Sequence, residues 1–217
     1  MNGYKKKKLT KFIETAKINH FFFKRKVKMK KICLFLLLLI LWTAMAQASD
    51  KVVMVIAHSD FRDEELFETK DVLEDKGIKV TIASSALGLA RGMLGGTIKP
   101  DILVNQIDVN NYDAIVFVGG IGASEYWDSA IAHKITKEAI EKKKVVAAIC
   151  IAPVTLAKAG ILKGKKVTSW PSEADKLGKG GAIYTGKDVE VDGLIVTAAG
   201  PKAAKGFGKG ILKALGK

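Results

Sequence analysis

Nearly continuous apolar runs alternate with helical patterns from residue 51 to the end of the chain. The runs are typical of strands buried on both faces of a sheet, and they occupy residues 51–57, 78–83, 112–118 and 145–149. Shorter apolar segments that also predict strands lie at 102–104, 166–170, 189–191 and 194–197. Helical spacing occurs at 63–76, 129–144, 155–159 and 207–215. In the second of these helices, Ile131, Ile135 and Ile140 are expected to face the core. Strands that alternate with helices predict an α/β domain with a doubly wound, mostly parallel sheet and helices on both faces.

Cys150 lies where the apolar run 145–149 meets the next helical pattern. No Gly, Asn or Ser separates the two elements, so the cysteine is predicted to occupy a sharp bend with its sulfur at the N-terminus of the helix. The partial positive charge and unpaired N–H groups of that end favour the thiolate, which is the reactive form of cysteine. The alternative is a buried core cysteine, because cysteine is often buried. The position at the junction favours a reactive residue.

Two other segments follow predicted strands and carry candidate chemistry. Glu65 belongs to the acidic stretch after the first strand, and Gly119-Gly120 ends the third long one. Because ligands of doubly wound sheets bind at the carboxyl ends of the strands, we expect these segments and Cys150 to share one edge. Glu65 could exchange a proton with the Cys150 sulfur, and the N–H groups of Gly120 and Ile151 could form an oxyanion hole. A solvated acid in the first helical turn and a tight turn that needs positive φ are the alternatives.

Histidines, metal-ligand clusters and nucleotide-binding motifs are scarce. From residue 49 onward the chain has only His58 and His133, and neither is next to Cys150 in the sequence. No group of cysteines and histidines has metal-ligand spacing, and no phosphate-binding loop or complete dinucleotide fingerprint occurs. We therefore predict no metal and no cofactor. The lysines are scattered over helix faces without an aromatic platform, which argues against nucleic-acid binding.

The positive charge of the chain is concentrated at its start. The formal net charge is +14, and residues 1–48 contribute +11 of it, with 12 Lys and Arg against the single acid Glu14. Basic residues between positions 24 and 31 precede an apolar run over 32–45, and Ala46-Gln47-Ala48 follows. A basic segment, a short apolar core and an A-x-A site predict a secretory signal peptide that is cleaved after Ala48. The predicted organisation is a leader, 1–48, and a single α/β domain, 49–217.

Cleavage near Ala48 would export the domain to the periplasm or the extracellular space, with no stable membrane partner. An uncleaved N-terminal segment that anchors the protein in a membrane is the alternative. Cys33 lies in the apolar core of the leader and would leave with it. Cys150 would then be the sole thiol, so no disulfide could form within the chain. A solitary thiol in an exported protein is a liability unless it is buried or used.

Four ordered motifs resemble the ThiJ/PfpI superfamily, which includes the Parkinson-disease protein, PfpI-type intracellular proteases and class I glutamine amidotransferase-like domains. They are FRDEEL at 61–66, DAIVFVGG at 113–120, AAICIAP at 147–153 and VDGLIVT at 191–197. The resemblance covers residues 51–215 and implies a flavodoxin-like, class I glutamine amidotransferase-like fold and, commonly, a homodimer. It also implies that Cys150 is the nucleophile-elbow cysteine, that Glu65 hydrogen-bonds its sulfur, and that the amides of Gly120 and Ile151 form the oxyanion hole.

Two residues depart from the patterns of this superfamily. PfpI-type members carry a histidine directly after the cysteine, where this chain has Ile151. Members similar to the Parkinson-disease protein carry a histidine in a Thr-His-Pro segment, where this chain has Trp170. Trp170 is expected to make the pocket, which also includes Gly119, more apolar. The absence of both histidines argues against peptidase and amidotransferase-like activity.

The resemblance leaves two main functional hypotheses. In the first, the protein performs glyoxalase- or deglycase-like chemistry: the Cys150 thiolate adds to a small reactive carbonyl compound and Glu65 shuttles the proton. In the second, it is a non-enzymatic protein of the oxidative-stress response, and Cys150 is oxidised reversibly. A third alternative is a scaffold that keeps the family fold without chemistry.

Overall fold

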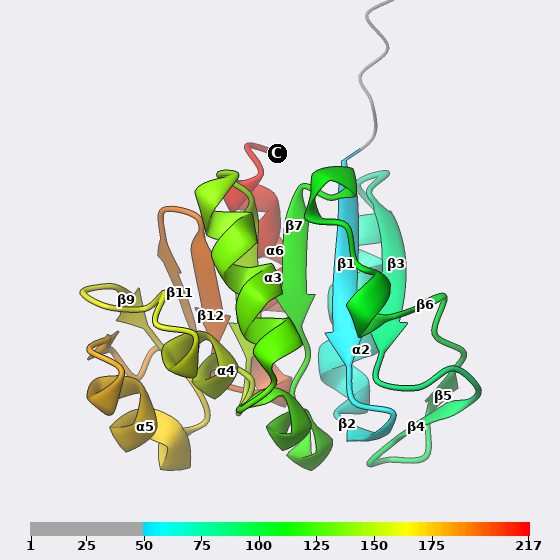
Figure 1. The fold of residues 1–217 in the computed structure, drawn as a ribbon, viewed down its shortest axis with the longest axis horizontal. Coiled ribbons are helices and arrows are strands. Elements are labelled where there is room, and N and C mark those ends of the chain that lie inside the picture. Colours follow the sequence, from blue (N-terminus) through cyan, green and yellow to red (C-terminus); the bar gives the residue numbers. More distant parts are fainter. Residues whose placement is uncertain (1–49) are drawn as a thin grey trace, which may run out of the picture. The chain divides into compact units, whose positions relative to one another are not determined.

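Seven strands form the central sheet of the part of the chain that the structure, a computed structural model, describes, residues 50–217. Their order is β11 (Val189–Asp192), β12 (Ile195–Ala198), β8 (Val145–Ile149), β7 (Ala114–Phe117), β1 (Lys51–Ile56), β3 (Lys79–Ser84) and β6 (Ile102–Leu103). All neighbouring strands are parallel except β11 and β12, which are antiparallel. The strand order and the crossovers confirm the predicted doubly wound α/β fold (Figure 1).

Helices cover both faces of this sheet (Figure 1). On one face, α2 (Asp63–Glu74) packs against α6 (Ala204–Ala214), and on the other α3 (Ala130–Glu141) packs against α4 (Pro153–Lys158). The residues of β1 alternate between two cores: Met54 belongs to the first and Val55 to the second, and both are fully buried. Because each such aliphatic side chain contributes about 1.5–3 kcal/mol when buried, a strand without polar residues is what this double burial requires.

Several local predictions were wrong. The strand predicted over 166–170 ends at Val167, where β9 (Lys166–Val167) pairs with β10 (Ile183–Tyr184) outside the central sheet. Beyond it the chain turns toward the cysteine, because the N–H of Trp170 donates to the carbonyl of Cys150 at 2.8 Å. Ile131 is 46% exposed rather than facing the core, since it lies in the first turn of α3.

Some elements have no counterpart among the sequence predictions. A small sheet of β2 (Ser59–Phe61), β4 (Ala90–Gly92) and β5 (Thr97–Ile98) lies beside the carboxyl ends of β1 and β3, and a short helix, α5 (Ala174–Lys179), packs on α4. Asp63 holds the turn between β4 and β5, because its carboxylate accepts the N–H groups of Leu94 at 2.8 Å and Gly96 at 2.7 Å. The glycine-rich stretch is therefore an ordered hairpin attached to the start of α2.

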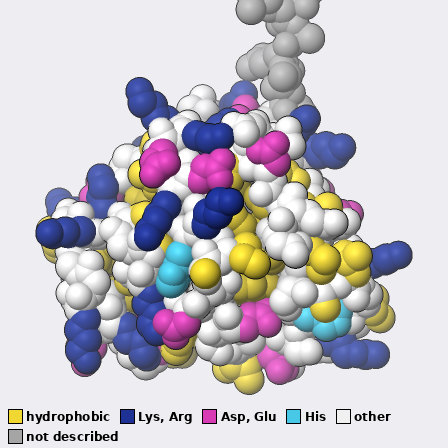
Figure 2. Space-filling model, in the orientation of Figure 1, with side chains coloured by type: hydrophobic (Ala, Val, Ile, Leu, Met, Phe, Trp, Pro, Cys, Tyr) yellow, Lys and Arg dark blue, Asp and Glu magenta, His cyan; other side chains and the backbone are white. Residues whose placement is uncertain are grey.

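The leader predicted over residues 1–48, with its cleavage after Ala48, lies outside the described residues. Within residues 50–217 no helix is long and apolar enough to cross a membrane. On the face shown in Figure 2, basic and acidic side chains are interspersed. This mixture agrees with the small net charge of the sequence from residue 49 onward.

Candidate active site

Cys150 occupies a strained bend between β8 and α4. Its φ angle is 64°, in the left-handed region that non-glycine residues rarely adopt. Two backbone hydrogen bonds hold it there: its N–H donates to Ala198 of β12 at 2.9 Å, and its carbonyl accepts the N–H of Trp170 at 2.8 Å. Helix α4 begins at Pro153, so Ile151 and Ala152 form the turn. The bend expected from the sequence is present. Cys150 is buried and packs with the core cluster on one face of the sheet, as the alternative of a core cysteine predicted, and it also lines a cavity at the edge of the sheet.

Glu65 reaches the cysteine from the first turn of α2. Its side chain is fully buried, so the alternative of a solvated surface acid was wrong. Oε2 accepts the N–H of Gly119 at 3.0 Å, and the carboxyl group contacts the Cys150 sulfur. Oε1 has no hydrogen-bond partner within residues 50–217. A buried carboxyl oxygen without a partner is costly, and it belongs to the carboxyl group that hydrogen-bonds the Cys150 sulfur.

The Gly119-Gly120 turn needs glycine at both positions. Gly120 has a positive φ angle, and neighbouring atoms approach both residues too closely for a side chain. Gly120 has a φ of 97°, and a Cβ on it would collide with the backbone of residues 60–62. A Cβ on Gly119 would meet the Glu65 carboxyl group and would lie 2.5 Å from the Cβ of Cys150. The alternative of a tight turn that needs positive φ is therefore confirmed for Gly120, and the oxyanion hole stays a prediction. Gly119 lies behind the reactive residues and does not line the cavity, in contrast to the sequence prediction.

Burial governs the protonation of the reactive pair. It raises the pKa of Glu65 from 4.5 to about 8, and it raises the pKa of the Cys150 thiol to about 12, with a further increase from the neighbouring carboxylate. The N–H groups of Gly120 and Ile151 hydrogen-bond the sulfur and lower the pKa of the thiol, but their effect is smaller. The thiolate expected from the sequence is therefore not the resting form, because desolvation outweighs the amides. A proton on Glu65 removes the nearby negative charge and makes the thiolate easier to form.

A cavity of about 220 Å³ opens above the sulfur. It is lined by Arg62, Met93, Gly120, Ile121, Cys150, Ile151, Trp170 and Pro201. The sequence prediction included the glycine, Cys150, Ile151 and Trp170 but missed the others, which come from separate loops. The glycine-rich stretch at 92–96 was the available signal for Met93. Arg62 is the one charged side chain of the lining, and its guanidinium forms a bidentate pair with Glu64 at 2.8 and 2.9 Å.

Neither histidine of the described chain lines this cavity. His58 follows β1 and lies near Gly88, and His133 sits on α3 with its Nε2 2.8 Å from the carbonyl of Trp127. The two positions at which the superfamily carries a histidine, Ile151 and Trp170, both face the cavity. The site therefore has a cysteine, a carboxyl group and two amide donors, without a cysteine–histidine pair.

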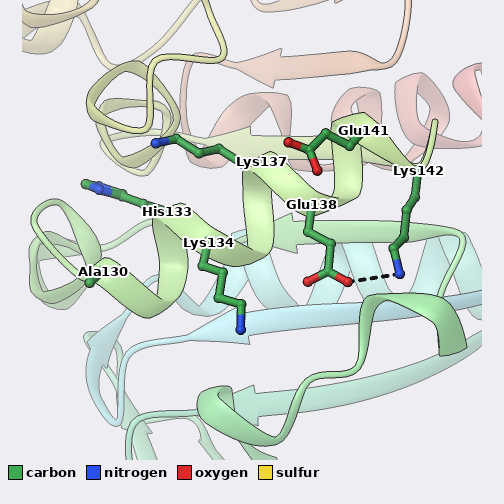
Figure 3. Close-up of a pocket in the computed structure, with 7 residues that line it drawn as sticks. All are labelled: Ala130, His133, Lys134, Lys137, Glu138, Glu141 and Lys142. Atoms are coloured by element: carbon green, nitrogen blue, oxygen red, sulfur yellow. Dashed lines mark ion pairs between the residues drawn. The ribbon is translucent and has the colours of Figure 1, made fainter.

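A larger hollow, of about 700 Å³, lies over the outer face of α3 and has different properties (Figure 3). Its side chains all come from this helix and from Lys142, the residue that follows it, and Lys142 forms an ion pair with Glu138 at 3.0 Å. Lysines and glutamates dominate the lining, and no nucleophile faces it. Within residues 50–217 no cluster of three or more His, Cys, Asp or Glu could hold a metal ion. We therefore place the candidate chemistry at Cys150.

Comparison with known proteins agrees with this geometry. The family model described as the DJ-1/PfpI family matches residues 50–214. The chain belongs to the DJ-1/PfpI family. It is 49% identical to the uncharacterised protein MJ0967 of Methanocaldococcus jannaschii, over 77% of this chain and 83% of that protein. It is 33% identical to the deglycase TK1284 of Thermococcus kodakarensis, over 69% of this chain and 90% of that protein.

A more distant relative and a solved structure extend the comparison. The glutathione-independent glyoxalase DJR-1.2 of Caenorhabditis elegans is 26% identical over 77% of this chain and 90% of that protein. The crystal structure of a ThiJ/PfpI domain protein from Brachyspira murdochii has a TM-score of 0.76 and 34% identity, and the match covers 77% of this chain and 97% of that one. DJ-1/PfpI membership and the α/β fold are thus established.

Proposed function

We propose that this DJ-1/PfpI protein is a cysteine-dependent enzyme of the glyoxalase or deglycase type, with small reactive carbonyl compounds as substrates. The observation that carries the proposal is the fully buried Glu65, whose carboxyl group hydrogen-bonds the Cys150 sulfur. A carboxyl group with a pKa of about 8 is close to the value at which a group both accepts and returns a proton near neutral pH. Relatives named as deglycase and glyoxalase support the same chemistry.

The reaction on an α-oxoaldehyde follows from these groups. The thiol proton passes to the Glu65 carboxylate while the Cys150 sulfur bonds to the aldehyde carbon, and the carbonyl electron pair moves to oxygen. We expect the amides of Gly120 and Ile151, which hydrogen-bond the sulfur, to donate to that oxyanion. Transfer of the C1 hydrogen to C2 as a proton oxidises the first carbon and reduces the second, which gives a thioester. Water then cleaves the carbon–sulfur bond and releases a 2-hydroxy acid and the thiol.

Peptidase chemistry fits this site less well. Expulsion of an amine requires a proton donor at the leaving group, which a histidine usually supplies. No histidine lines the cavity of the described chain, and Trp170 and Ile151 occupy the two lining positions at which members of the superfamily carry one. An α-oxoaldehyde needs no such donor, because its product forms without loss of an amine.

Turnover of methylglyoxal by purified residues 49–217 tests the proposed function. We expect methylglyoxal to disappear and lactate to accumulate in equal amounts, and we expect the Cys150→Ala protein to lose this activity. The matched control is Cys150→Ser, which keeps the size of the side chain but offers a much weaker nucleophile. Equal rates for the wild type and Cys150→Ala would refute a cysteine-dependent mechanism.

A second candidate function is oxidation sensing by the same thiol. A protonated Glu65 donates a hydrogen bond, and such a donor stabilises a sulfinate formed when peroxide oxidises Cys150. The prediction is that mild peroxide adds one or two oxygen atoms to Cys150, and that Glu65→Leu shifts the product toward further oxidation. Mass spectrometry of the digested protein measures both. Oxygen found on the methionines but not on Cys150 would exclude this function.

We also propose that the domain is exported after cleavage near Ala48, as the basic segment and apolar run of the sequence predict.

Homodimer formation, which the family resemblance implies, stays a prediction that sedimentation velocity of residues 49–217 would test.

A further inference from the structure

A second hollow adjoins the cysteine cavity. It has a volume of about 480 Å³ and is bounded by the start of α2, the Trp170-Pro171 turn and the loop over 199–203. Arg62, Trp170 and Pro201 line both this hollow and the cavity above Cys150. The two spaces are therefore neighbours along one groove, and the side chain of Trp170 is a wall of each.

Trp170 is held firmly at this position. Its N–H donates to the carbonyl of Cys150 at 2.8 Å, which ties its backbone to the bend that carries the sulfur. Its ring lies against Gly200: a Cβ on this glycine would fall 2.8 Å from Cε3 and 3.0 Å from Cζ3 of the indole. The side chain nevertheless remains 47% exposed. A large aromatic surface that is fixed before binding costs little entropy when a ligand packs on it.

Volume and charge indicate what this groove accepts. The cavity above Cys150, at about 220 Å³, is smaller than the typical range of about 300–1,000 Å³ for ligand sites, and the second hollow brings the groove into that range. Arg62 is already paired with Glu64 through two hydrogen bonds. The other charged side chains of the lining, Asp188 and Lys202, are exposed and of opposite sign. The wall shared by the two spaces therefore has an apolar surface from Trp170 and Pro201 and an arginine whose charge Glu64 compensates, and it favours an apolar group over an anionic one.

We propose that the second hollow is the subsite for an apolar substituent, aromatic or branched, of an α-oxoaldehyde whose carbonyl reacts at Cys150. Trp170, seated on Gly200, is the residue that determines this specificity. The inference rests on the proposed function, but it also makes a claim about binding that can be tested without turnover. Oxoaldehydes with a large substituent are expected to be better substrates than methylglyoxal.

Binding of reaction products tests the subsite by itself. The probes are mandelate and lactate, the 2-hydroxy acids with a phenyl and a methyl substituent, titrated calorimetrically into the Cys150→Ala protein. We expect mandelate to bind at least about tenfold more tightly than lactate, since even one methylene in an apolar pocket changes affinity by about that factor. The additional change Trp170→Ala is expected to abolish the difference. Equal affinities of the two acids before that change would overturn the inference.

Kinetics on two substrates test the specificity. With initial rates on phenylglyoxal and methylglyoxal, Trp170→Ala should lower kcat/KM about tenfold more for phenylglyoxal than for methylglyoxal, and the additional loss should come mainly through KM. Gly200→Ala should act in the same direction, because the added methyl group displaces the indole ring. Ile183→Ala is the matched control, since Ile183 is 53% exposed and lines neither hollow.

The outcomes separate the subsite from the reaction. Preference for mandelate that depends on Trp170, without turnover of either oxoaldehyde, would refute the proposed function and support the subsite. Turnover of both oxoaldehydes with equal losses in Trp170→Ala would support the reaction and overturn the subsite. Thermal unfolding of each variant shows whether the fold is intact, and Trp170→Phe, which keeps an aromatic ring, should retain most of the preference.

Discussion

At the scale of single residues, the chemistry of this protein depends on two buried groups that must share protons. Cys150 and Glu65 come from elements far apart in the sequence and meet beside the Gly119-Gly120 turn. The sequence predicted both residues, because each follows the end of a strand at the same edge of the sheet. It did not predict their protonation. The position of Cys150 before a helix suggested a thiolate, but burial is the main cause of both pKa shifts. The degree of burial depends on packing that only the structure shows.

The raised pKa of Glu65 predicts how stability depends on pH. The unfolded carboxyl group ionises near its ordinary pKa of 4.5, whereas the folded one keeps its proton up to about 8. The unfolded state therefore releases protons first, and the stabilising difference present below pH 4.5 is lost as pH rises toward 8. Relative to Glu65→Gln, the free energy of unfolding of the wild type should fall by a few kcal/mol between about pH 5 and pH 8. Urea titrations at several pH values measure it.

The same substitution predicts a loss of activity. The amide of Glu65→Gln keeps the size of the side chain but cannot accept the thiol proton, so methylglyoxal turnover should fall about 100-fold or more. The pKa of Cys150, followed by the rate of alkylation against pH, should decrease, because a negative charge beside the sulfur is removed. The role given to Glu65 would be contradicted if the free energy of unfolding of the wild type and of Glu65→Gln changed in parallel with pH. Unchanged methylglyoxal turnover in Glu65→Gln would also contradict it.

At the scale of elements, the strands that could be predicted from the sequence were those with a long hydrophobic pattern. The strands β1, β7 and β8 were predicted because each is buried on both faces and has no polar residue at its centre. The hairpin of β4 and β5 was not, because its strands have only two or three residues and Asp63, about thirty positions earlier in the chain, holds its turn. Its Met93 was therefore missed as part of the cavity, as was the turn that brings Trp170 to Cys150.

The Gly119-Gly120 turn gives a prediction at this scale. Gly120→Ala should lower the free energy of unfolding by about 2 kcal/mol or more, because a positive φ and a collision with residues 60–62 add together. Gly164→Ala is the matched control: Gly164 has a φ of 73° but no atom within 4 Å of the added Cβ. It should lose only about 1 kcal/mol. Similar losses in the two variants, measured by denaturant unfolding, would show that close approach at Gly120 is unimportant.

At the scale of the whole molecule, charge separates two parts of the chain. Residues 1–48 carry +11 of the net charge of +14, so the remainder is close to neutral. A strongly basic protein would suggest a nucleic-acid partner, but the basicity is confined to the segment that resembles a secretory leader. We propose that this charge belongs to a leader that directs export, and it leaves the interpretation of the Cys150 site unchanged.

Export of the domain can be tested in a bacterial host that expresses the full chain. Cleavage after Ala48 predicts a soluble protein in the periplasmic extract whose intact mass corresponds to residues 49–217, with Ser49 at its N-terminus. Replacement of both Ala46 and Ala48 by lysine should block cleavage, because the A-x-A site requires small residues, and should leave the full-length chain in the membrane fraction. If the wild-type chain itself remains full length and membrane-bound, the apolar run 32–45 is an anchor and Cys33 stays with the protein. Cys150 would then no longer be its sole thiol.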